Sequence, residues 1–572
     1  MKKRTRALLW IGMIAAVVLV GGCALGGLLG FLNPSVPSTS NAWSFGILSD
    51  TQWTMPDDGK NPNTCAVDII NQVNQQFILK GVKFVVAVGD LVDTGNPANE
   101  DVRATYAQAL YNAGIGFYPL RGNHDSAANG AAEFKILYPQ TQTGLNNQTP
   151  TSAFSVQGTT DPAVQPPAKS GSAFVIGSNF SSPSTALTGL SYSFDYNNAR
   201  FMLLDQFTPP DSSANTIDAQ QGWISGQLSG RGSNTHAFVF GHKGIITENH
   251  VDNLFAANPG LDPSGQDAFI KSLNDNMVHY YIGGHDHMHD RSIVTTTDGT
   301  TARINQLVCA SDSSKFYIPA NPTSNDVLYD VPAFGHTRQT PIAQELNIVG
   351  YYIVTVDGAN VTVDFYSAVV NPFLSSGEYL ISTTPSLNFT WRERFGYSLA
   401  GKEFVIPQGA SYTTVNDSYS GAGGKTYVKI LSGTNANTAK DLSGRPYSLA
   451  VDTGWIPKTA GLLSDIVRLW GMEYNLGSSA TDTYTISLTF SLTPGKAAAN
   501  PGDLGVLKLD ASGTKWVNAV SSNSGGSPRF VEGPWKPSYG LGTYGRDFTT
   551  NPPTAWAVIN TGGTFAVGLF GT

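Results

Sequence analysis

The 572-residue sequence has few charged residues and no basic tract beyond its first six positions. Charged side chains make up 13 % of the chain, about half of the ~25 % that is usual in soluble domains. The formal net charge is −8. Sequence-independent binding to nucleic acid needs clustered Lys and Arg against phosphates, so nucleic acid is not an expected partner.

Cysteine is also scarce. The three cysteines are Cys23, Cys65 and Cys309, which cannot form a CxxC-type zinc framework. Cys23 lies in an apolar N-terminal segment, so only Cys65 and Cys309 are available to pair in the rest of the chain. A disulfide between these two is compatible with the sequence but is not required by it.

Hydrophobic residues make up 41 % of the chain, which is enough for packed cores and excludes wholesale disorder. A chain of this length is too long for a single core. We predict a leader at residues 1–32, a linker at 33–42, a catalytic domain at 43–370 and an accessory domain at 371–572.

The N-terminal segment has the features of an export signal. Four basic residues within positions 2–6 precede an uncharged run over residues 7–32. Val20-Gly21-Gly22-Cys23 resembles a bacterial lipobox, in which Cys23 would be lipidated. The alternative is an uncleaved signal anchor, because the apolar run can span a ~30 Å hydrocarbon core as a helix. Both alternatives anchor the chain to a membrane and place residues 34–572 outside the cytoplasm, in the periplasm or at the cell surface.

Apolar runs alternate with segments of helical periodicity after the linker. The predicted strands include residues 43–48, 84–88 and 116–120, and the predicted helices lie between them. This alternation is typical of an α/β sheet. Residues 126–187 form a long polar insertion, which in such a domain is usually a functional loop or a small additional β structure.

The last two hundred residues have a different pattern. Alternating apolar and polar residues from position 484 to 492 predict a strand, and the region resembles an all-β sandwich. Within it we predict a helical insert near residues 462–470 and a hairpin formed by residues 555–559 and 564–569. No cluster of His, Asp and Glu occurs in this region, so we expect it to contribute no catalytic group.

Clusters of ionisable residues follow five of the predicted strands, where α/β folds place their functional sites. In chain order these blocks are Asp50-Thr51-Gln52, Gly89-Asp90-Leu91-Val92-Asp93, Gly122-Asn123-His124-Asp125, Gly241-His242 and Gly284-His285-Asp286-His287. A single block would be weak evidence for a site, whereas the ordered set is strong evidence.

These blocks resemble the signature of the calcineurin-like metallophosphoesterases, which reads D-x-H, G-D-x-x-D, G-N-H-D/E, G-H and G-H-x-H. Four of the five blocks match, and the resemblance covers about residues 43–370. It implies an αββα four-layer sandwich, followed here by the C-terminal all-β sandwich-like domain. The departure is Gln52, which stands where the family has His.

The resemblance also implies a centre of two divalent transition-metal ions, Mn, Fe, Zn or Co, because mixed N and O ligands suit these metals better than Ca²⁺. Asp90 would bridge the two ions and offset their repulsion. The implied ligands are Asp50, Gln52 and His287 for the first ion and Asn123, His242 and His285 for the second. Because an amide oxygen binds metal more weakly than imidazole, a single-ion enzyme is the alternative.

In the family, the residue at the position of His124 is a general acid or a hydrogen-bond donor to the phosphoryl group, and Asp93 would hold its other ring nitrogen. The implied reaction is attack of a metal-bound hydroxide on a phosphate mono- or diester. The alternatives are a non-catalytic cell-envelope binding protein that keeps the fold, and an envelope protein whose metals only stabilise it.

Several nearby residues are assigned no chemistry by the sequence. We expect His250 to be a structural or surface residue and Asp205 to be a turn residue. His289 is expected to lie on a strand surface, and the alternative is that it supports a metal ligand from behind. Arg121 is expected to be a surface charge rather than an electrostatic aid to catalysis. Trp53 is expected to pack against the first loop rather than to wall the substrate pocket.

Overall fold

The computed structural model describes most of the chain from residue 41 onward. The described residues are 41–142, 176–207, 216–232, 234–250, 252–255, 263–317, 338–399, 411–416, 425–432, 441–445, 462–464, 466–470, 483–490, 502–510 and 515–570. The predicted leader, most of the linker and residues 143–175 of the predicted insertion therefore lie outside the described residues.

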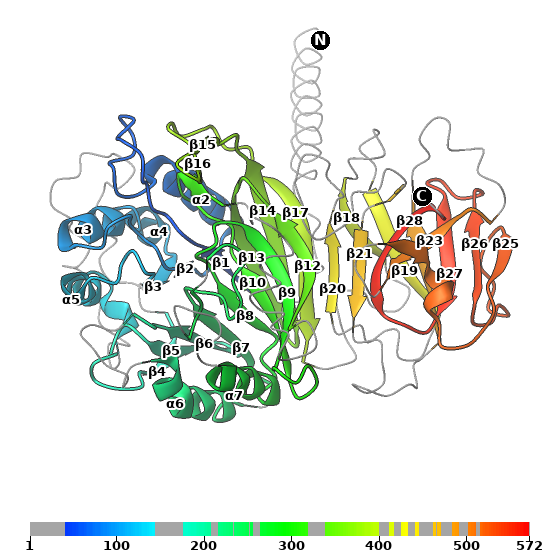
Figure 1. Ribbon diagram of the computed structural model, residues 1–572, viewed down its shortest axis with the longest axis horizontal. Coiled ribbons are helices and arrows are strands. Elements are labelled where there is room, and N and C mark those ends of the chain that lie inside the picture. Colours follow the sequence, from blue (N-terminus) through cyan, green and yellow to red (C-terminus); the bar gives the residue numbers. More distant parts are fainter. Residues whose placement is uncertain are drawn as a thin grey trace, which may run out of the picture. The chain divides into compact units, whose positions relative to one another are not determined.

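Two large sheets form the centre of the first half, and one of them continues into the C-terminal half (Figure 1). The first has 11 strands, in the order β24 (Trp516–Asn518), β23 (Leu504–Leu509), β28 (Gly563–Leu569), β21 (Ile466–Trp470), β20 (Asp441–Arg445), β17 (Thr390–Ser398), β14 (Asn360–Val369), β13 (Ile348–Asp357), β1 (Trp43–Leu48), β2 (Phe84–Val88) and β3 (Gly116–Leu120). The second has 8 strands, in the order β12 (Gln339–Glu345), β9 (His289–Thr295), β10 (Arg303–Val308), β8 (Tyr280–Gly283), β7 (His236–Gly241), β6 (Ala199–Leu204), β5 (Tyr192–Tyr196) and β4 (Ser178–Ser181).

Helices cover the outer face of each sheet. The described helices are α2 (Val67–Lys80), α3 (Pro97–Thr105), α4 (Gln108–Asn112), α5 (Ala128–Leu137), α6 (Ile217–Ser229) and α7 (Pro263–Asp275). The first of them buries apolar residues at helical spacing and ends at Gly81, whose φ of 65° suits a left-handed cap. The helix predicted between the strands at residues 84–88 and 116–120 is divided into α3 and α4.

Three apolar cores separate the four layers. Alternating residues of β2 point to opposite faces, so Phe84 and Val86 pack between the two sheets while Val85 packs under α2. A third core lies between the second sheet and its helices, with Val239 of β7 and Phe269 of α7 among its members. The predicted αββα sandwich is thereby confirmed.

The C-terminal half is a β sandwich that shares one of its sheets with the first half. Its other sheet has 6 strands, in the order β18 (Ser411–Asn416), β19 (Lys425–Ser432), β22 (Tyr484–Thr489), β27 (Thr554–Ile559), β26 (Thr543–Asp547) and β25 (Arg529–Glu532). Residues of β28 and β22 pack together in the core between them. The predicted boundary near residue 371 falls between β14 and β17, which are paired neighbours.

Two local predictions for this half were wrong. The helical insert near residues 462–470 is the strand β21, which pairs with β20 and β28. Ile466 and Val467 are buried in different cores, so both faces of the strand are apolar, and that pattern does not distinguish a short strand from a helix.

The hairpin predicted from residues 555–559 and 564–569 does not form. β27 pairs with β22 and β26 in the six-stranded sheet, whereas β28 pairs with β21 and β23 in the other sheet. The segment between them crosses from one sheet to the other. Asn560 is hydrogen-bonded to Asn523 and Ser524 instead of closing a tight turn.

A small third sheet extends the first half beyond residue 370. It consists of β11 (Lys315–Phe316), β16 (Glu378–Leu380) and β15 (Phe373–Ser375). Cys65 and Cys309 are both buried and both free, so they form no disulfide. Within the described residues, no helix combines the length and apolarity that a membrane crossing requires.

Candidate metal centre

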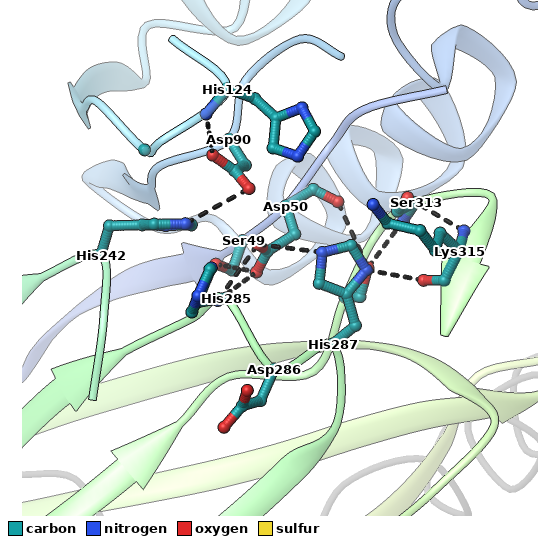
Figure 2. Close-up of polar contacts among 12 residues, drawn as sticks. Ser49, Asp50, Asp90, His124, His242, His285, Asp286, His287, Ser313 and Lys315 are labelled. Carbon is teal, nitrogen blue, oxygen red and sulfur yellow. Dashed lines mark hydrogen bonds and ion pairs between the residues drawn. The ribbon is translucent and has the colours of Figure 1, made fainter. Parts of the chain in front are cut away.

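The candidate metal centre lies where loops leave the carboxyl ends of β1, β2, β3, β7 and β8 (Figure 2). β1, β2 and β3 are parallel neighbours, and so are β7 and β8, so their carboxyl ends meet at one edge of each sheet. The side chains that these loops contribute are Asp50, Asp90, Asn123, His124, His242, His285 and His287.

Four candidate ligands have left-handed backbone conformations. The φ angles are 52° at Asp50, 47° at Asp90, 75° at His285 and 51° at His287. Non-glycine residues adopt this region rarely, and such strain concentrates at functional sites. The surrounding strands therefore hold these four side chains in orientations that the backbone alone would not favour.

Close approach of the loops requires two of the glycines. A Cβ at Gly122 would collide with the carboxylate of Asp90, and a Cβ at Gly284 would collide with Ser49 and Asp50. These glycines allow the loops after β3 and β8 to lie against the carboxylates.

Asp50, Asp90 and His287 form the first group of potential ligands, with one atom of each within 4.8 Å of the others. Oδ1 of Asp50 lies 3.4 Å from Nε2 of His287 and accepts a hydrogen bond from the backbone N–H of His285 at 3.1 Å. Oδ2 accepts a hydrogen bond from the hydroxyl of Ser49 at 2.5 Å. The Asp50 carboxylate is thus fixed on two sides.

Asp90, His242 and His285 form the second group, again within 4.8 Å of one another. Nε2 of His242 lies 3.3 Å from Oδ2 of Asp90 and 3.1 Å from Oδ1 of Asn123. Asp90 belongs to both groups, and this places its carboxylate between them. The arrangement matches the bridging role that the sequence assigns to Asp90.

Each of the three histidines has an oxygen partner for the ring nitrogen that faces away from the group. Nδ1 of His242 lies 2.8 Å from the carbonyl oxygen of Val88, and Nδ1 of His287 lies 2.7 Å from that of Lys315. Nε2 of His285 lies 3.2 Å from Oδ1 of Asp252. Metal-binding histidines commonly donate their second N–H to such oxygens, which fixes the tautomer and the ring orientation.

Electrostatics favour charged carboxylates in the centre. Burial opposes ionisation, but His287 beside Asp50 and His242 beside Asp90 outweigh it and hold the pKa of both carboxyls below the usual value. Burial also lowers the pKa of an imidazole, yet the Asp90 carboxylate raises the pKa of His242 to about 9. The pKa of His285 is lowered by burial to about 4, which leaves this ring neutral and able to ligate a metal.

The buried donors fit a pair of cations. Oδ2 of Asp90 is buried and receives no well-directed hydrogen bond from the described residues. Two buried carboxylates and three imidazoles in one pocket would be costly to hold without a cation to offset the charge. The residues present therefore suit two divalent ions that share Asp90.

Residues 44–289 match the family model of the calcineurin-like phosphoesterases. This region is a calcineurin-like phosphoesterase domain. The family match supports hydrolase activity on phosphoesters. A search of curated proteins finds no match.

Several solved structures are similar to the chain at low identity. One is the Plasmodium protein GAP50, an anchor in the inner membrane complex, with 14 % identity, a TM-score of 0.33, and coverage of 59 % of this chain and 90 % of that one. The purple acid phosphatase PPD1 from yellow lupin has 14 % identity, a TM-score of 0.33, and coverage of 57 % and 52 %. A dimetal phosphatase from Danio rerio has 15 % identity, a TM-score of 0.31, and coverage of 56 % and 95 %.

His124 lies at the open side of the phosphoesterase centre and is partly exposed. Its backbone N–H donates to Oδ1 of Asp90 at 2.9 Å. Its Nδ1 lies 2.6 Å from the carbonyl oxygen of Asp93 and 3.6 Å from the carboxylate of the same residue. The carbonyl oxygen therefore orients the ring, and the carboxylate lies within ion-pair range.

Gln52 is buried beside the phosphoesterase centre. Neither its amide oxygen nor its amide nitrogen has a hydrogen-bond partner among the described residues. An unpaired buried polar group costs about 1–3 kcal/mol. A metal ligated by the oxygen would offset part of that cost, so the ligand role of Gln52 stays a prediction.

Sequence reasoning missed a group of residues behind His285. The ring of His250 stacks on that of His285 with centroids 3.9 Å apart, and Nδ1 of His250 lies 2.8 Å from the buried carboxylate of Asp286. Asp252 pairs with His285 and also with Lys243. His250 and Asp252 lie in an irregular loop and match no block of the signature, so no sequence pattern pointed to them.

The structure also places four other residues for which the sequence predicted no chemistry. Arg121 and Asp205, interpreted as a surface charge and a turn residue, form a fully buried ion pair at 2.7 Å. His289 is buried rather than on a strand surface, between Tyr352 and Glu393. Trp53 is fully buried in the core between the first sheet and its helices.

Proposed function

We propose that this chain is an exported, metal-dependent phosphoesterase that hydrolyses phosphate mono- or diesters. The observation that carries the proposal is the pair of ligand groups that share Asp90, each within 4.8 Å. The family match of residues 44–289 supports the same reaction class. Export is an expectation from the N-terminal sequence.

Asp50, His287 and Gln52 would hold the first ion, and the second would be held by a set of residues after β3, β7 and β8. That set is Asn123, His242 and His285, with Asp90 shared between the ions. The mixture of carboxylate, amide and imidazole ligands suits Mn, Fe, Zn or Co. When bound, such ions polarise phosphoryl oxygens and supply activated water as the nucleophile.

His124 would hold the proton that the leaving group needs. With Nδ1–H donated to the carbonyl oxygen of Asp93 at 2.6 Å, a proton on Nε2 can be given to the departing oxygen. The Asp93 carboxylate lies 3.6 Å from Nδ1, within ion-pair range of the same ring. This chain thus retains an acid as well as its ligands, which favours a hydrolase over a binding protein that has lost turnover.

The test begins with metal content. The purified protein should contain about two divalent ions per chain, and reconstitution with Mn, Zn, Fe or Co should give turnover of nitrophenyl phosphate or of bis(nitrophenyl) phosphate. An Asp90→Asn variant is the control and should lose metal and turnover together. A metal-loaded wild-type chain that hydrolyses neither mono- nor diesters would favour the envelope binding protein instead.

A further inference from the structure

Lys315 lies beside the metal centre but outside the five sequence blocks and beyond the family match. It belongs to β11, and its carbonyl oxygen lies 2.7 Å from Nδ1 of the candidate ligand His287 (Figure 2). Its side chain is only 9 % exposed. Its ammonium group interacts electrostatically with Asp93 and Asp90, so the charge lies near the centre.

Two neighbours contact the ammonium group. The hydroxyl of Tyr317 is within hydrogen-bonding reach, and the Tyr317 ring also packs edge-on against His287 with centroids 5.1 Å apart. The carboxylate of Glu378 on β16 lies 3.9 Å from Nζ. An ammonium group has three N–H donors, so these two neighbours leave at least one donor for a ligand.

Pairing with Glu378 does not account for this buried ammonium. The Glu378 side chain is 43 % exposed and the 3.9 Å separation exceeds hydrogen-bond length, so the pair contributes little to stability. A buried ammonium group is costly to keep without a close partner, so an anion bound next to the phosphoesterase centre would be the strongest partner of Lys315.

We propose that the Lys315 ammonium binds a non-bridging phosphoryl oxygen of the substrate and exchanges its weak contact with Glu378 for that anion. The proposal rests on the proposed phosphoesterase function and adds a specificity-determining residue to it. Asp93, Asp90, Tyr317 and Glu378 are the charged or titratable groups around Nζ that the described residues provide.

The test compares Lys315→Met and Lys315→Arg with wild type, using inorganic phosphate as the probe. Phosphate affinity of the metal-loaded protein is measured by calorimetry, and KM and metal content are measured in parallel. We expect Lys315→Met to weaken phosphate binding and to raise KM by about tenfold or more, since a hydrogen bond from a charged group is lost. Lys315→Arg should retain most of the affinity because it keeps the charge. Metal content should not change in either variant.

A matched control and a second variant sharpen the result. Lys271→Met removes an exposed lysine of α7 that pairs with Asp275, and it should change none of these quantities. Glu378→Gln should tighten phosphate binding, because it removes the competing carboxylate. Phosphate affinity that is unchanged in Lys315→Met, metal lost from that variant, or weaker phosphate binding in Glu378→Gln would each overturn the proposal. Phosphate binding through Lys315 without hydrolysis of any ester would refute the proposed function alone.

Discussion

At the scale of single residues, His124 allows proton donation to be separated from metal binding. We expect His124→Asn to lower kcat by about 10²–10⁴-fold with little change in KM, because general acid help acts only in the transition state. The loss should be smaller for nitrophenyl esters, whose leaving groups need little protonation. Steady-state kinetics on esters of graded leaving-group pKa, with metal analysis of each variant, would check this.

The Asp93→Asn variant is a control for His124→Asn, because it should lower the rate by a smaller factor. The carbonyl oxygen of Asp93 orients the ring at 2.6 Å and survives the substitution, while the carboxylate lies 3.6 Å away. The rate loss should therefore be smaller than that of His124→Asn. If His124→Asn strips a metal, or slows every leaving group equally, His124 is a ligand or a scaffold residue.

Gln52 is the second residue whose role can be measured. If its amide oxygen ligates the first ion, Gln52→His should tighten that ion and Gln52→Ala should weaken it, because imidazole is the stronger ligand. Competition with a chelator would give both affinities. Equal affinity in both variants and in wild type would show that Gln52 only fills space.

The sequence was most informative about residues that directly follow a strand. Asp50, Asp90 and His242 could be predicted because each follows a buried apolar run and an ordered block fixes its neighbours. His250 and Asp252 could not be predicted, because they reach His285 from an irregular loop whose path depends on tertiary packing.

At the scale of elements, β17 is tied to the strand that follows the last ligand block. Glu393 of β17 bonds to His289 and forms a bidentate pair with Arg291, both on β9. All three side chains are buried. We expect Glu393→Ala to lower the free energy of unfolding by about 3–5 kcal/mol, because it leaves a buried guanidinium without its partner. Urea denaturation would measure the loss.

A surface pair gives the control for Glu393. Glu532 of β25 pairs with Arg546 at 3.0 Å but is 50 % exposed, so Glu532→Ala should cost less than about 1 kcal/mol. Similar losses for both variants would mean that the β9–β17 contact does not stabilise the fold.

Element types were predictable where one periodicity dominated. The helix α6 and the strands β1, β2 and β3 match their apolar patterns closely. The strand β21 and the crossing between β27 and β28 did not follow from the sequence, because strand partners are set by non-local pairing. The local sequence pattern predicts the type of an element better than it predicts which strands pair in a sheet.

At the scale of the whole molecule, the N-terminal sequence predicts that catalysis takes place outside the cytoplasm. If Cys23 is lipidated, the chain made in a bacterial host should fractionate with membranes, and Cys23→Ser should lose the lipid. If the segment is a signal anchor, the same variant should stay in the membrane with its full mass. Mass spectrometry of the N-terminus separates the two, and finding residues 34–572 in the cytoplasm would contradict export.

Because the 11-stranded sheet is continuous, β20 of the C-terminal half covers the edge that β17 would otherwise expose. β17 would become an edge strand of nine residues if β20 were removed, with a row of unpaired backbone N–H and C=O groups. Exposed edges of this length promote pairing between separate molecules. We therefore expect a chain that lacks the β sandwich to associate edge to edge through β17.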